Sequence, residues 1–278
     1  MQTTGGYLNV GNGKLYYETA GEGEPVVLIH AAFLDSRMFD AQWTTLAEQF
    51  RVIRYDMQGF GQSDPAPGPL CRRENLRQLL KHLDVEQAHF VGCSNGGQIA
   101  LDLLLEEPER VLSLTLVGST PSGFDQQGPP PPEILEMFEA FQEGNIARVN
   151  ELQTHIWFDG FSRQPEDVDP NLRQQALAMN RIPVERGTFL AADMQPVRLL
   201  DPPALTRLET VNCPTLVVVG ALDHSEVLRA ADILAEKIPG ARKVIIEQSG
   251  HVPSFERPDV FTPLFHEFLS NPQPVPRI

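Results

Sequence analysis

Cysteine is scarce in this chain of 278 residues: Cys71, Cys93 and Cys213 are widely separated and form no Cys-x-x-Cys motif. Such a set favours neither a disulfide framework nor a zinc site. Basic residues are also outnumbered, since 22 Lys and Arg face 37 Asp and Glu, for a formal net charge of −15. Nucleic acids and anionic membranes bind basic surfaces, so this balance argues against both as partners.

A long hydrophobic run is also missing, because a membrane-spanning helix needs about 18 or more apolar residues. The longest apolar stretches, such as residues 26–34, are only as long as a strand, and His30 interrupts this one. The first residues, MQTTGGYLNVGNG, contain neither the basic nor the apolar segment of a secretory signal. With 41% hydrophobic residues to build a core, we expect a cytoplasmic globular protein that acts on a small molecule.

Short, mostly apolar segments alternate with segments of helical periodicity over most of the chain. The strand-like segments are residues 25–29, 51–55, 89–92, 112–117, 215–219 and 243–246, and the helical ones are 41–49, 73–83, 97–107, 226–238 and 260–269. Continuous apolar runs are typical of strands buried on both faces. The alternation predicts an α/β fold with a mainly parallel sheet flanked by helices. An antiparallel hairpin is expected before it, with Gly11-Asn12-Gly13 as its turn.

The alternation stops in the middle of the chain, where no strand-like segment occurs. A proline run at residues 129–132 opens this region, and proline can continue neither a helix nor a strand ladder. Helical periods follow at residues 134–142, 146–158, 171–180 and 188–194. We therefore expect residues 1–120 and 204–278 to form a core domain, with residues 121–203 inserted as a helical cap.

The segment Gly92-Cys93-Ser94-Asn95-Gly96 has the pattern G-x-S-x-G between a predicted strand and a predicted helix. In a turn this sharp, the residues two before and two after the serine nearly touch, so both must lack a Cβ atom. The serine hydroxyl then lies exposed above the sheet edge, next to free N–H groups of the helix. We predict Ser94 as a nucleophile; an ordinary glycine-rich loop would lack the flanking strand and helix.

A serine needs a base that is oriented by a third group. His251 follows the predicted strand 243–246, and Asp223 follows the predicted strand 215–219. Loops at the carboxyl ends of parallel strands meet at one edge of the sheet. We predict that Ser94, His251 and Asp223 act as nucleophile, base and orienting acid.

Other residues compete for these roles. His30 is expected to brace loops, His224 to lie at the surface or the pocket rim, and His155 to face the pocket only if the cap turns it inward. Asp56 is an alternative acid within a turn motif, and Cys93 is expected to be a packed core thiol. Three further histidines lie away from the predicted site and are expected to be exposed: His82, His89 and His266.

These motifs resemble those of the α/β-hydrolase superfamily over nearly the whole chain. Residues 30–42 resemble its histidine–glycine oxyanion loop, and residues 56–63 resemble its D-x-x-G-x-G-x-S turn. The resemblance implies that the backbone N–H groups of Ala32 and Asn95 form an oxyanion hole. Ala31 departs from the family by replacing the usual glycine. A serine nucleophile argues against the superfamily's dehalogenases and epoxide hydrolases, which use aspartate.

Apolar residues of the cap and of the oxyanion loop are candidates to line a substrate pocket. The candidates are Phe33, Leu34, Phe138, Phe141, Trp157 and Phe158. We expect most of the cap's apolar residues to form its own core and its contact with the sheet domain.

Together these features predict a serine hydrolase that cleaves a small, largely apolar ester or lactone without a metal or an organic cofactor. The segment from Gly250 to Pro258 resembles the enol-lactonase, esterase and cofactor-free haloperoxidase branch, although Phe33 replaces the proline of the perhydrolases. Two alternatives remain open. One is a carbon–carbon bond hydrolase of ring-cleavage products, which would use the same three residues. The other is a receptor-like protein with little turnover.

Overall fold

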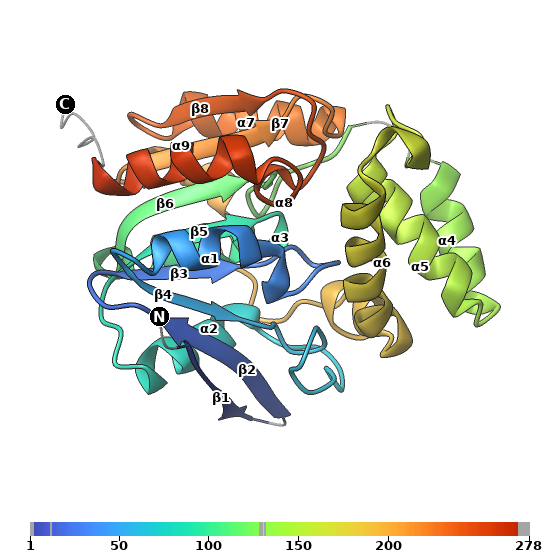
Figure 1. The fold of residues 1–278 in the computed structure, drawn as a ribbon, viewed down its shortest axis with the longest axis horizontal. Coiled ribbons are helices and arrows are strands. Elements are labelled where there is room, and N and C mark those ends of the chain that lie inside the picture. Colours follow the sequence, from blue (N-terminus) through green and yellow to red (C-terminus); the bar gives the residue numbers. More distant parts are fainter. Residues whose placement is uncertain (1–2, 12, 128–129, 131, 272–278) are drawn as a thin grey trace.

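The computed structural model describes residues 3–11, 13–127, 130 and 132–271. Within them, eight strands form one sheet in the order β1-β2-β4-β3-β5-β6-β7-β8 (Figure 1). The strands are β1 (Thr3–Val10), β2 (Gly13–Ala20), β3 (Pro25–Ile29), β4 (Arg51–Tyr55), β5 (Ala88–Cys93), β6 (Val111–Val117), β7 (Thr215–Gly220) and β8 (Arg242–Ile246). β2 pairs antiparallel with β1 and β4, and all other pairs are parallel. The predicted fold class and the hairpin are confirmed, while Asn12 lies outside the described residues.

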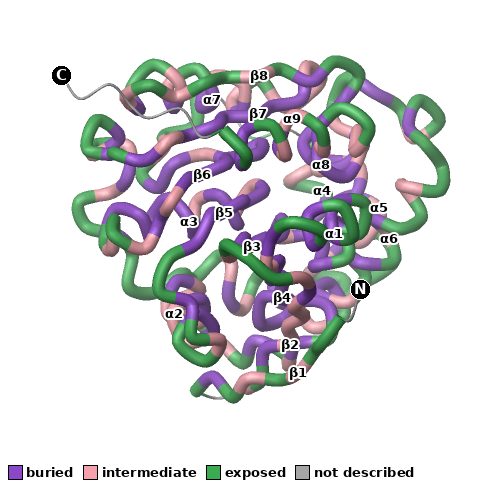
Figure 2. Tube along the Cα trace, turned by 60° about the vertical axis from the view of Figure 1, so that its left-hand side comes forward, coloured by how far each residue is buried: buried purple, intermediate pink, exposed green. Residues whose placement is uncertain are grey.

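Helices cover both faces of the sheet. On one face lie α1 (Asp40–Leu46) and α9 (Pro258–Ser270), and on the other lie α2 (Arg72–His82), α3 (Asn95–Glu106) and α7 (Ser225–Lys237). Along β3, Val26 and Leu28 face the first group and Val27 and Ile29 face the second. The central strands are therefore buried throughout, whereas the edge strands β1 and β8 are largely exposed (Figure 2). This double burial explains the continuous apolar runs in the sequence.

A helical region lies between β6 and β7, beyond the carboxyl ends of the strands (Figure 1). It contains α4 (Pro132–Gln142), α5 (Ile146–Thr154), the π-helical turn η3 (His155–Asp159), α6 (Pro170–Glu185) and a second π-helical turn, η5 (Phe189–Asp193). No described residue between β6 and β7 belongs to a strand. Part of the proline run at residues 129–132 lies outside the described residues. We call this helical region, from α4 to η5, the insert.

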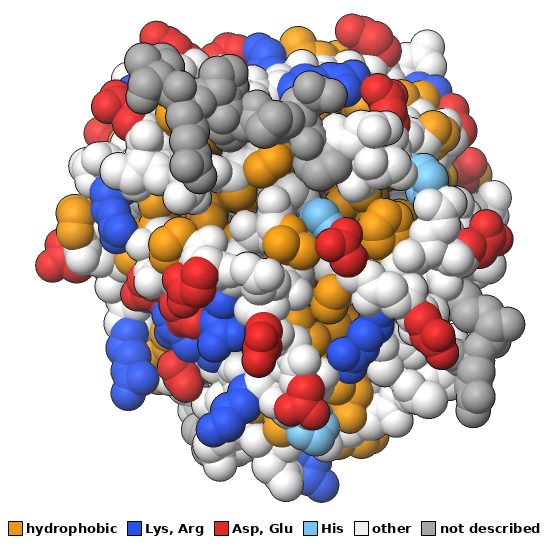
Figure 3. All heavy atoms as spheres, turned by 90° about the vertical axis from the view of Figure 1, so that its left-hand side faces the viewer, with side chains coloured by type: hydrophobic (Ala, Val, Ile, Leu, Met, Phe, Trp, Pro, Cys, Tyr) orange, Lys and Arg blue, Asp and Glu red, His pale blue; other side chains and the backbone are white. Residues whose placement is uncertain are grey.

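The remaining helical elements are short. They are α8 (Pro253–Glu256) and the 3-10 turns η1 (Ser36–Phe39), η2 (Pro108–Arg110), η4 (Pro165–Asp167), η6 (Ala204–Thr206) and η7 (Leu208–Thr210). None of the helices in the described part of the chain is both long and apolar enough to span a membrane. On the face away from the insert, acidic and basic side chains are interspersed (Figure 3).

The structure corrects two details of the sequence prediction. His89 was expected to be exposed, but its residue surface is only 3% accessible. Its Nδ1 lies 2.7 Å from the Ser113 hydroxyl, because β5 is a central strand covered on both faces. The single helix predicted over residues 146–158 is instead divided into α5 and η3, where the helical turn widens.

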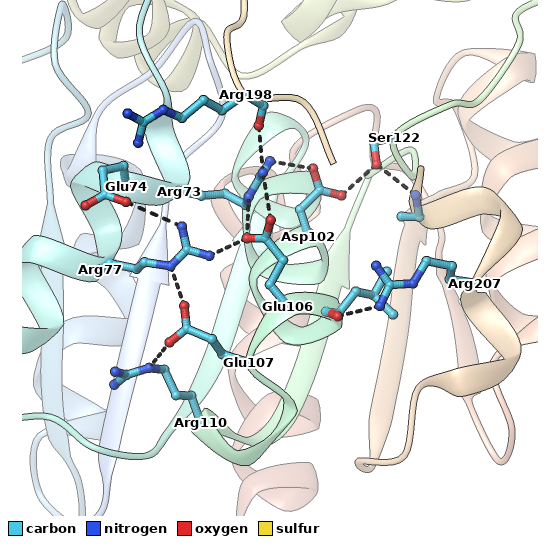
Figure 4. A network of polar contacts seen from close by, with 12 residues as sticks. Arg73, Glu74, Arg77, Asp102, Glu106, Glu107, Arg110, Ser122, Arg198 and Arg207 are labelled. Atoms are coloured by element: carbon cyan, nitrogen blue, oxygen red, sulfur yellow. Dashed lines mark hydrogen bonds and ion pairs between the residues drawn. The ribbon is translucent and has the colours of Figure 1, made fainter. Parts of the chain in front are cut away.

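A partly buried polar network joins α2, α3 and the chain that leaves the insert (Figure 4). The Arg73 guanidinium donates to Glu106 at 3.1 and 3.2 Å, to Asp102 at 3.3 Å and to the carbonyl of Arg198 at 2.7 Å. Asp102 also accepts a hydrogen bond from the Ser122 hydroxyl at 2.7 Å. Burial raises the pKa of Asp102, and Ser122 and Arg73 only partly oppose this effect. Arg73 therefore compensates the buried carboxylate of Asp102, while Glu106 of the same helix is exposed to solvent.

We expect Arg73→Met to lower the free energy of unfolding by about 3 kcal/mol, because it removes the cationic partner of the buried Asp102 carboxylate and leaves only Ser122 as a hydrogen-bond donor to it. Urea denaturation measures this change. The matched control is Arg181→Met, since the Arg181–Glu185 pair on α6 is exposed and should contribute at most about 0.5 kcal/mol. Equal effects of the two substitutions would contradict the importance given to the network.

Candidate active site

Ser94 lies in the sharp turn between β5 and α3, with left-handed backbone angles of φ 53° and ψ −117°. Its N–H donates to the carbonyl of Val117 on β6 at 2.8 Å. A Cβ atom at Gly92 would lie 2.3 Å from the carbonyl oxygen of Gly96, and one at Gly96 would lie 2.3 Å from that of Ile29. The turn is therefore closed to any larger residue at both glycine positions.

The three side chains proposed from the sequence lie in one hydrogen-bonded chain. His251 Nε2 is 2.9 Å from Ser94 Oγ, and His251 Nδ1 is 3.0 and 3.1 Å from the two carboxylate oxygens of Asp223. Asp223 follows β7 and also accepts the backbone N–H of His224 at 2.7 Å. The side chains of His251 and Asp223 are only 7% and 2% exposed. This is the geometry needed for a serine to pass its proton to an oriented imidazole.

The basicity of His251 results from opposing influences. Burial is the largest and works against protonation, but the nearby carboxylate of Asp223, its hydrogen bond and the charge of Glu256 outweigh it. The pKa of His251 is therefore raised above its ordinary value. A raised pKa makes the imidazole a stronger proton acceptor but also leaves more of it already protonated near neutral pH.

The loop after β3 carries Ala32, the first proposed oxyanion donor. His30 fixes this loop, since its buried ring lies with Nδ1 2.8 Å from the carbonyl of Ala31 and with Nε2 accepting the N–H of Met57 at 2.8 Å. Burial lowers the pKa of His30, which keeps the ring neutral and suited to donate at one nitrogen and accept at the other. The bracing role expected for His30 is thus confirmed.

The second proposed donor, Asn95, is the first residue of α3. Within the described part of the chain, the backbone N–H groups of Asn95 and Ala32 have no hydrogen-bond acceptor outside regular helices and strands. Amides at the first turn of a helix also have no partner inside the helix. Their role as oxyanion donors stays a prediction.

Two alternative residues have structural contacts instead. The Asp56 carboxylate accepts the backbone N–H groups of Ser36 at 2.9 Å and Gln62 at 2.7 Å, which holds the 56–63 turn against η1. Cys93 is fully buried, and burial raises the pKa of its thiol well above the ordinary value. A thiol that stays protonated is a poor nucleophile, in agreement with the core role expected for it.

Two of the predicted pocket residues lie against the imidazole of His251. The ring of Phe33, from the oxyanion loop, stacks on it with centroids 6.5 Å apart and an interplanar angle of 29°. The ring of Trp157, from η3 of the insert, lies 5.5 Å away at 43°. The His251 ring is thus flanked by one aromatic side chain from the oxyanion loop and one from the insert.

The other predicted pocket residues lie in apolar clusters. Leu34 and Phe158 are fully buried in the cluster that joins the α1 and α9 face to the insert. Phe138 and Phe141 both pack against Phe189 within the insert, with centroids 6.1 Å apart in each case. Their proposed role in a pocket stays a prediction.

A small cavity of about 60 Å³ with a mixed polar and apolar lining opens beside Asn95, between α2, α3 and the end of the insert. Arg72 and Asp193 both line it and form an ion pair of 2.5 Å, with each side chain only 9% exposed. The second carboxylate oxygen of Asp193 is buried without a partner among the described residues. Sequence reasoning missed this pair, since its members are 121 positions apart.

Sequence reasoning also missed the role of Glu256, which lies in the segment from Gly250 to Pro258. Its carboxylate accepts backbone N–H groups of the His251 loop and pairs with Arg163 of the insert. The spacing of five residues after His251 was visible, but the distant arginine was not. Among the described residues, no group of three or more His, Cys, Asp or Glu side chains could hold a metal ion.

Comparison with known proteins places these features in a family. The chain is 28% identical over 257 residues to the pimeloyl-[acyl-carrier protein] methyl ester esterase of Aeromonas hydrophila, covering 91% of this chain and 98% of that one. It is 27% identical over 270 residues to the 2-hydroxy-6-oxo-6-phenylhexa-2,4-dienoate hydrolase of Burkholderia cepacia, covering 94% and 92%.

Among solved structures, that of Est816, an N-acyl homoserine lactone degrading enzyme, superposes with a TM-score of 0.78 at 28% identity. It covers 95% of this chain and 100% of that one. The alpha/beta hydrolase fold family matches residues 24–258, a span that includes Ser94, Asp223 and His251. The chain therefore belongs to the alpha/beta hydrolase fold family.

Proposed function

We propose that this hydrolase cleaves a small, largely apolar carboxylic ester or lactone through an acyl-enzyme intermediate on Ser94. The observation that carries the proposal is the continuous contact from Ser94 Oγ to His251 Nε2 and from His251 Nδ1 to Asp223, at 2.9 to 3.1 Å. A hydroxyl in this contact can lose its proton to the imidazole as it attacks a carbonyl carbon.

In the first half of the reaction, His251 accepts the proton of Ser94 as the hydroxyl oxygen bonds to the substrate carbonyl. Asp223 holds the tautomer with the proton on Nδ1 and stabilises the imidazolium that forms. The N–H groups of Ala32 and Asn95 donate to the carbonyl oxygen as it becomes negative. One such donor accelerates acyl transfer on the order of 100- to 1000-fold. The imidazolium then protonates the departing alcohol.

In the second half, His251 takes a proton from a water molecule that attacks the acyl carbon. The acid leaves when the bond to Ser94 breaks, and the hydroxyl is restored. In a lactone the alcohol and the acid remain one molecule, so the product is a hydroxy acid. The same five groups serve both halves of the reaction.

The surroundings of the base support an apolar substrate. Trp157 and Phe33 place aromatic rings against His251, and aromatic side chains are typical of the walls of apolar ligand sites. We propose residues 121–203 as a lid that supplies part of this wall. The similar proteins named as a methyl ester esterase and a lactone-degrading enzyme are consistent with this substrate class.

A carbon–carbon bond hydrolase is the second candidate, favoured by the 27% identical dienoate hydrolase. Such an enzyme would use the same serine, histidine and aspartate but would also need polar anchors for an anionic dienoate. The two activities are distinguished by substrate, since p-nitrophenyl esters and lactones test one and a dienone acid tests the other.

We expect Ser94→Ala and His251→Ala each to lower kcat/KM for short-chain p-nitrophenyl esters by on the order of 10⁴-fold, because nucleophile and base act as one unit. His224→Ala is the matched control and should retain most of the activity, since its side chain caps α7 through the N–H of Glu226. Steady-state assays of the purified variants, repeated with lactones and a dienone acid, measure this.

Ester hydrolysis that survives Ser94→Ala would refute the mechanism. Turnover of the dienone acid alone would favour the carbon–carbon hydrolase, and binding without turnover of any substrate would favour a receptor.

We also expect kcat/KM to rise with pH through a midpoint above 6.5, the ordinary value for histidine. Activity should rise with pH because only neutral His251 accepts the serine proton, and the midpoint should lie above the ordinary value because the pKa of His251 is raised in the folded enzyme. The measurement is kcat/KM from pH 5 to 9 with an uncharged ester. Because the substrate does not titrate, the midpoint reports a group of the free enzyme. A midpoint below the ordinary value of histidine would contradict the proposed environment of His251.

A further inference from the structure

One carboxylate accepts the backbone N–H groups of both residues that flank His251. Glu256, the last residue of α8, accepts the N–H of Gly250 at 2.9 and 3.1 Å and the N–H of Val252 at 3.3 Å. Its side chain is only 6% exposed. The loop that presents the imidazole to Ser94 is thus closed around Glu256, and its backbone amides are satisfied there.

The charge of Glu256 is balanced from the insert. Arg163 Nη1 lies 2.7 Å from Glu256, and the Arg163 side chain is 9% exposed. Its remaining donors reach the carbonyls of Phe158 and Asp159 at 2.7 Å each. A Cβ atom at Gly250 would lie 2.3 Å from Arg163 Nη2, so the guanidinium lies directly against the His251 loop.

The contacts of Arg163 also hold η3, the turn of the insert that lies over His251. Phe158 and Asp159 belong to η3, the turn whose Trp157 ring lies 5.5 Å from the His251 ring. One guanidinium therefore connects the turn that covers the imidazole to the loop that carries it. Contacts of this kind keep a catalytic side chain within the narrow range of productive geometry.

We propose that Glu256 and Arg163 form a positioning pair that holds His251 in register with Ser94 and couples its proton affinity to the docking of the insert. This inference rests on the proposed function, in which His251 is the base. Neither residue touches the reacting atoms; both act through the His251 loop.

The charges around His251 allow the inference to be tested by the direction in which the pKa of His251 shifts. The groups that face it are the Asp223 carboxylate after β7, the Cys93 thiol of β5, Glu256 on α8 and, behind Glu256, Arg163 from the insert. Phe33 and Trp157 carry no charge. Removing Arg163 exposes His251 to an uncompensated carboxylate, whereas neutralising Glu256 leaves an uncompensated guanidinium. The two changes should move the pKa of His251 in opposite directions.

The experiment is an NMR titration of the His251 imidazole in enzyme with isotope-labelled histidine, with the signal assigned by its loss in His251→Ala. We expect Arg163→Met to raise the pKa of His251 and Glu256→Gln to lower it, each by roughly 0.5 to 1 pH unit. The double variant should return close to the starting value. The acid limb of kcat/KM should move in the same directions.

Asp259→Asn is the matched control, because it removes an exposed carboxylate three positions from Glu256 and should leave the titration unchanged. Where Arg163→Met folds too poorly, Glu256→Gln carries the test, since the amide oxygen still accepts the flanking N–H groups, and Arg163→Lys should restore the original pKa. Folded variants with no shift, or with shifts of the same sign, would overturn the inference. The titration needs no turnover, so its failure is distinct from survival of hydrolysis in Ser94→Ala.

Discussion

At Ser94 the backbone turns through a left-handed conformation, and every other part of the candidate site is arranged around that turn. A non-glycine residue at φ 53° costs about 1–3 kcal/mol and persists only where the surroundings hold it. Here β5, buried on both faces, fixes one side of the turn and α3 fixes the other. Gly92 permits the close approach of α3 to β5, and Gly96 permits its close approach to the end of β3. The result is a hydroxyl at the carboxyl end of β5, next to the first backbone amides of α3.

The parallel sheet brings the remaining groups to this hydroxyl. Asp223 and His251 follow β7 and β8, neighbouring strands whose carboxyl ends lie on the same side as that of β5. The insert then approaches from the same side, and Trp157 and Arg163 reach the His251 loop through a ring contact and an ion pair. These contacts of the insert with the candidate site are therefore made at His251, the proposed base, and not at Ser94, the proposed nucleophile.

Much of this arrangement could be predicted from the sequence because it depends on local patterns. Strands 25–29 and 51–55 were predicted with the bounds that the structure gives, since double burial leaves an unbroken apolar run. The proximity of Ser94, Asp223 and His251 followed from parallel strand topology alone. The Arg163–Glu256 pair could not be predicted, because it spans 93 positions and depends on how the insert docks. His89 was misjudged for a related reason: it is buried by residues distant in the sequence, among them Ser113 on β6 and Phe50.

The central claim is that Ser94 is the nucleophile, and covalent labelling tests it most directly. An alkyl fluorophosphonate mimics the tetrahedral state of an ester and forms a stable bond with a serine activated by histidine. Intact-mass and peptide analysis should show a single adduct on the peptide that contains Ser94, and much slower labelling in His251→Ala. A stoichiometric adduct at another residue, or none in enzyme that hydrolyses esters, would contradict the account.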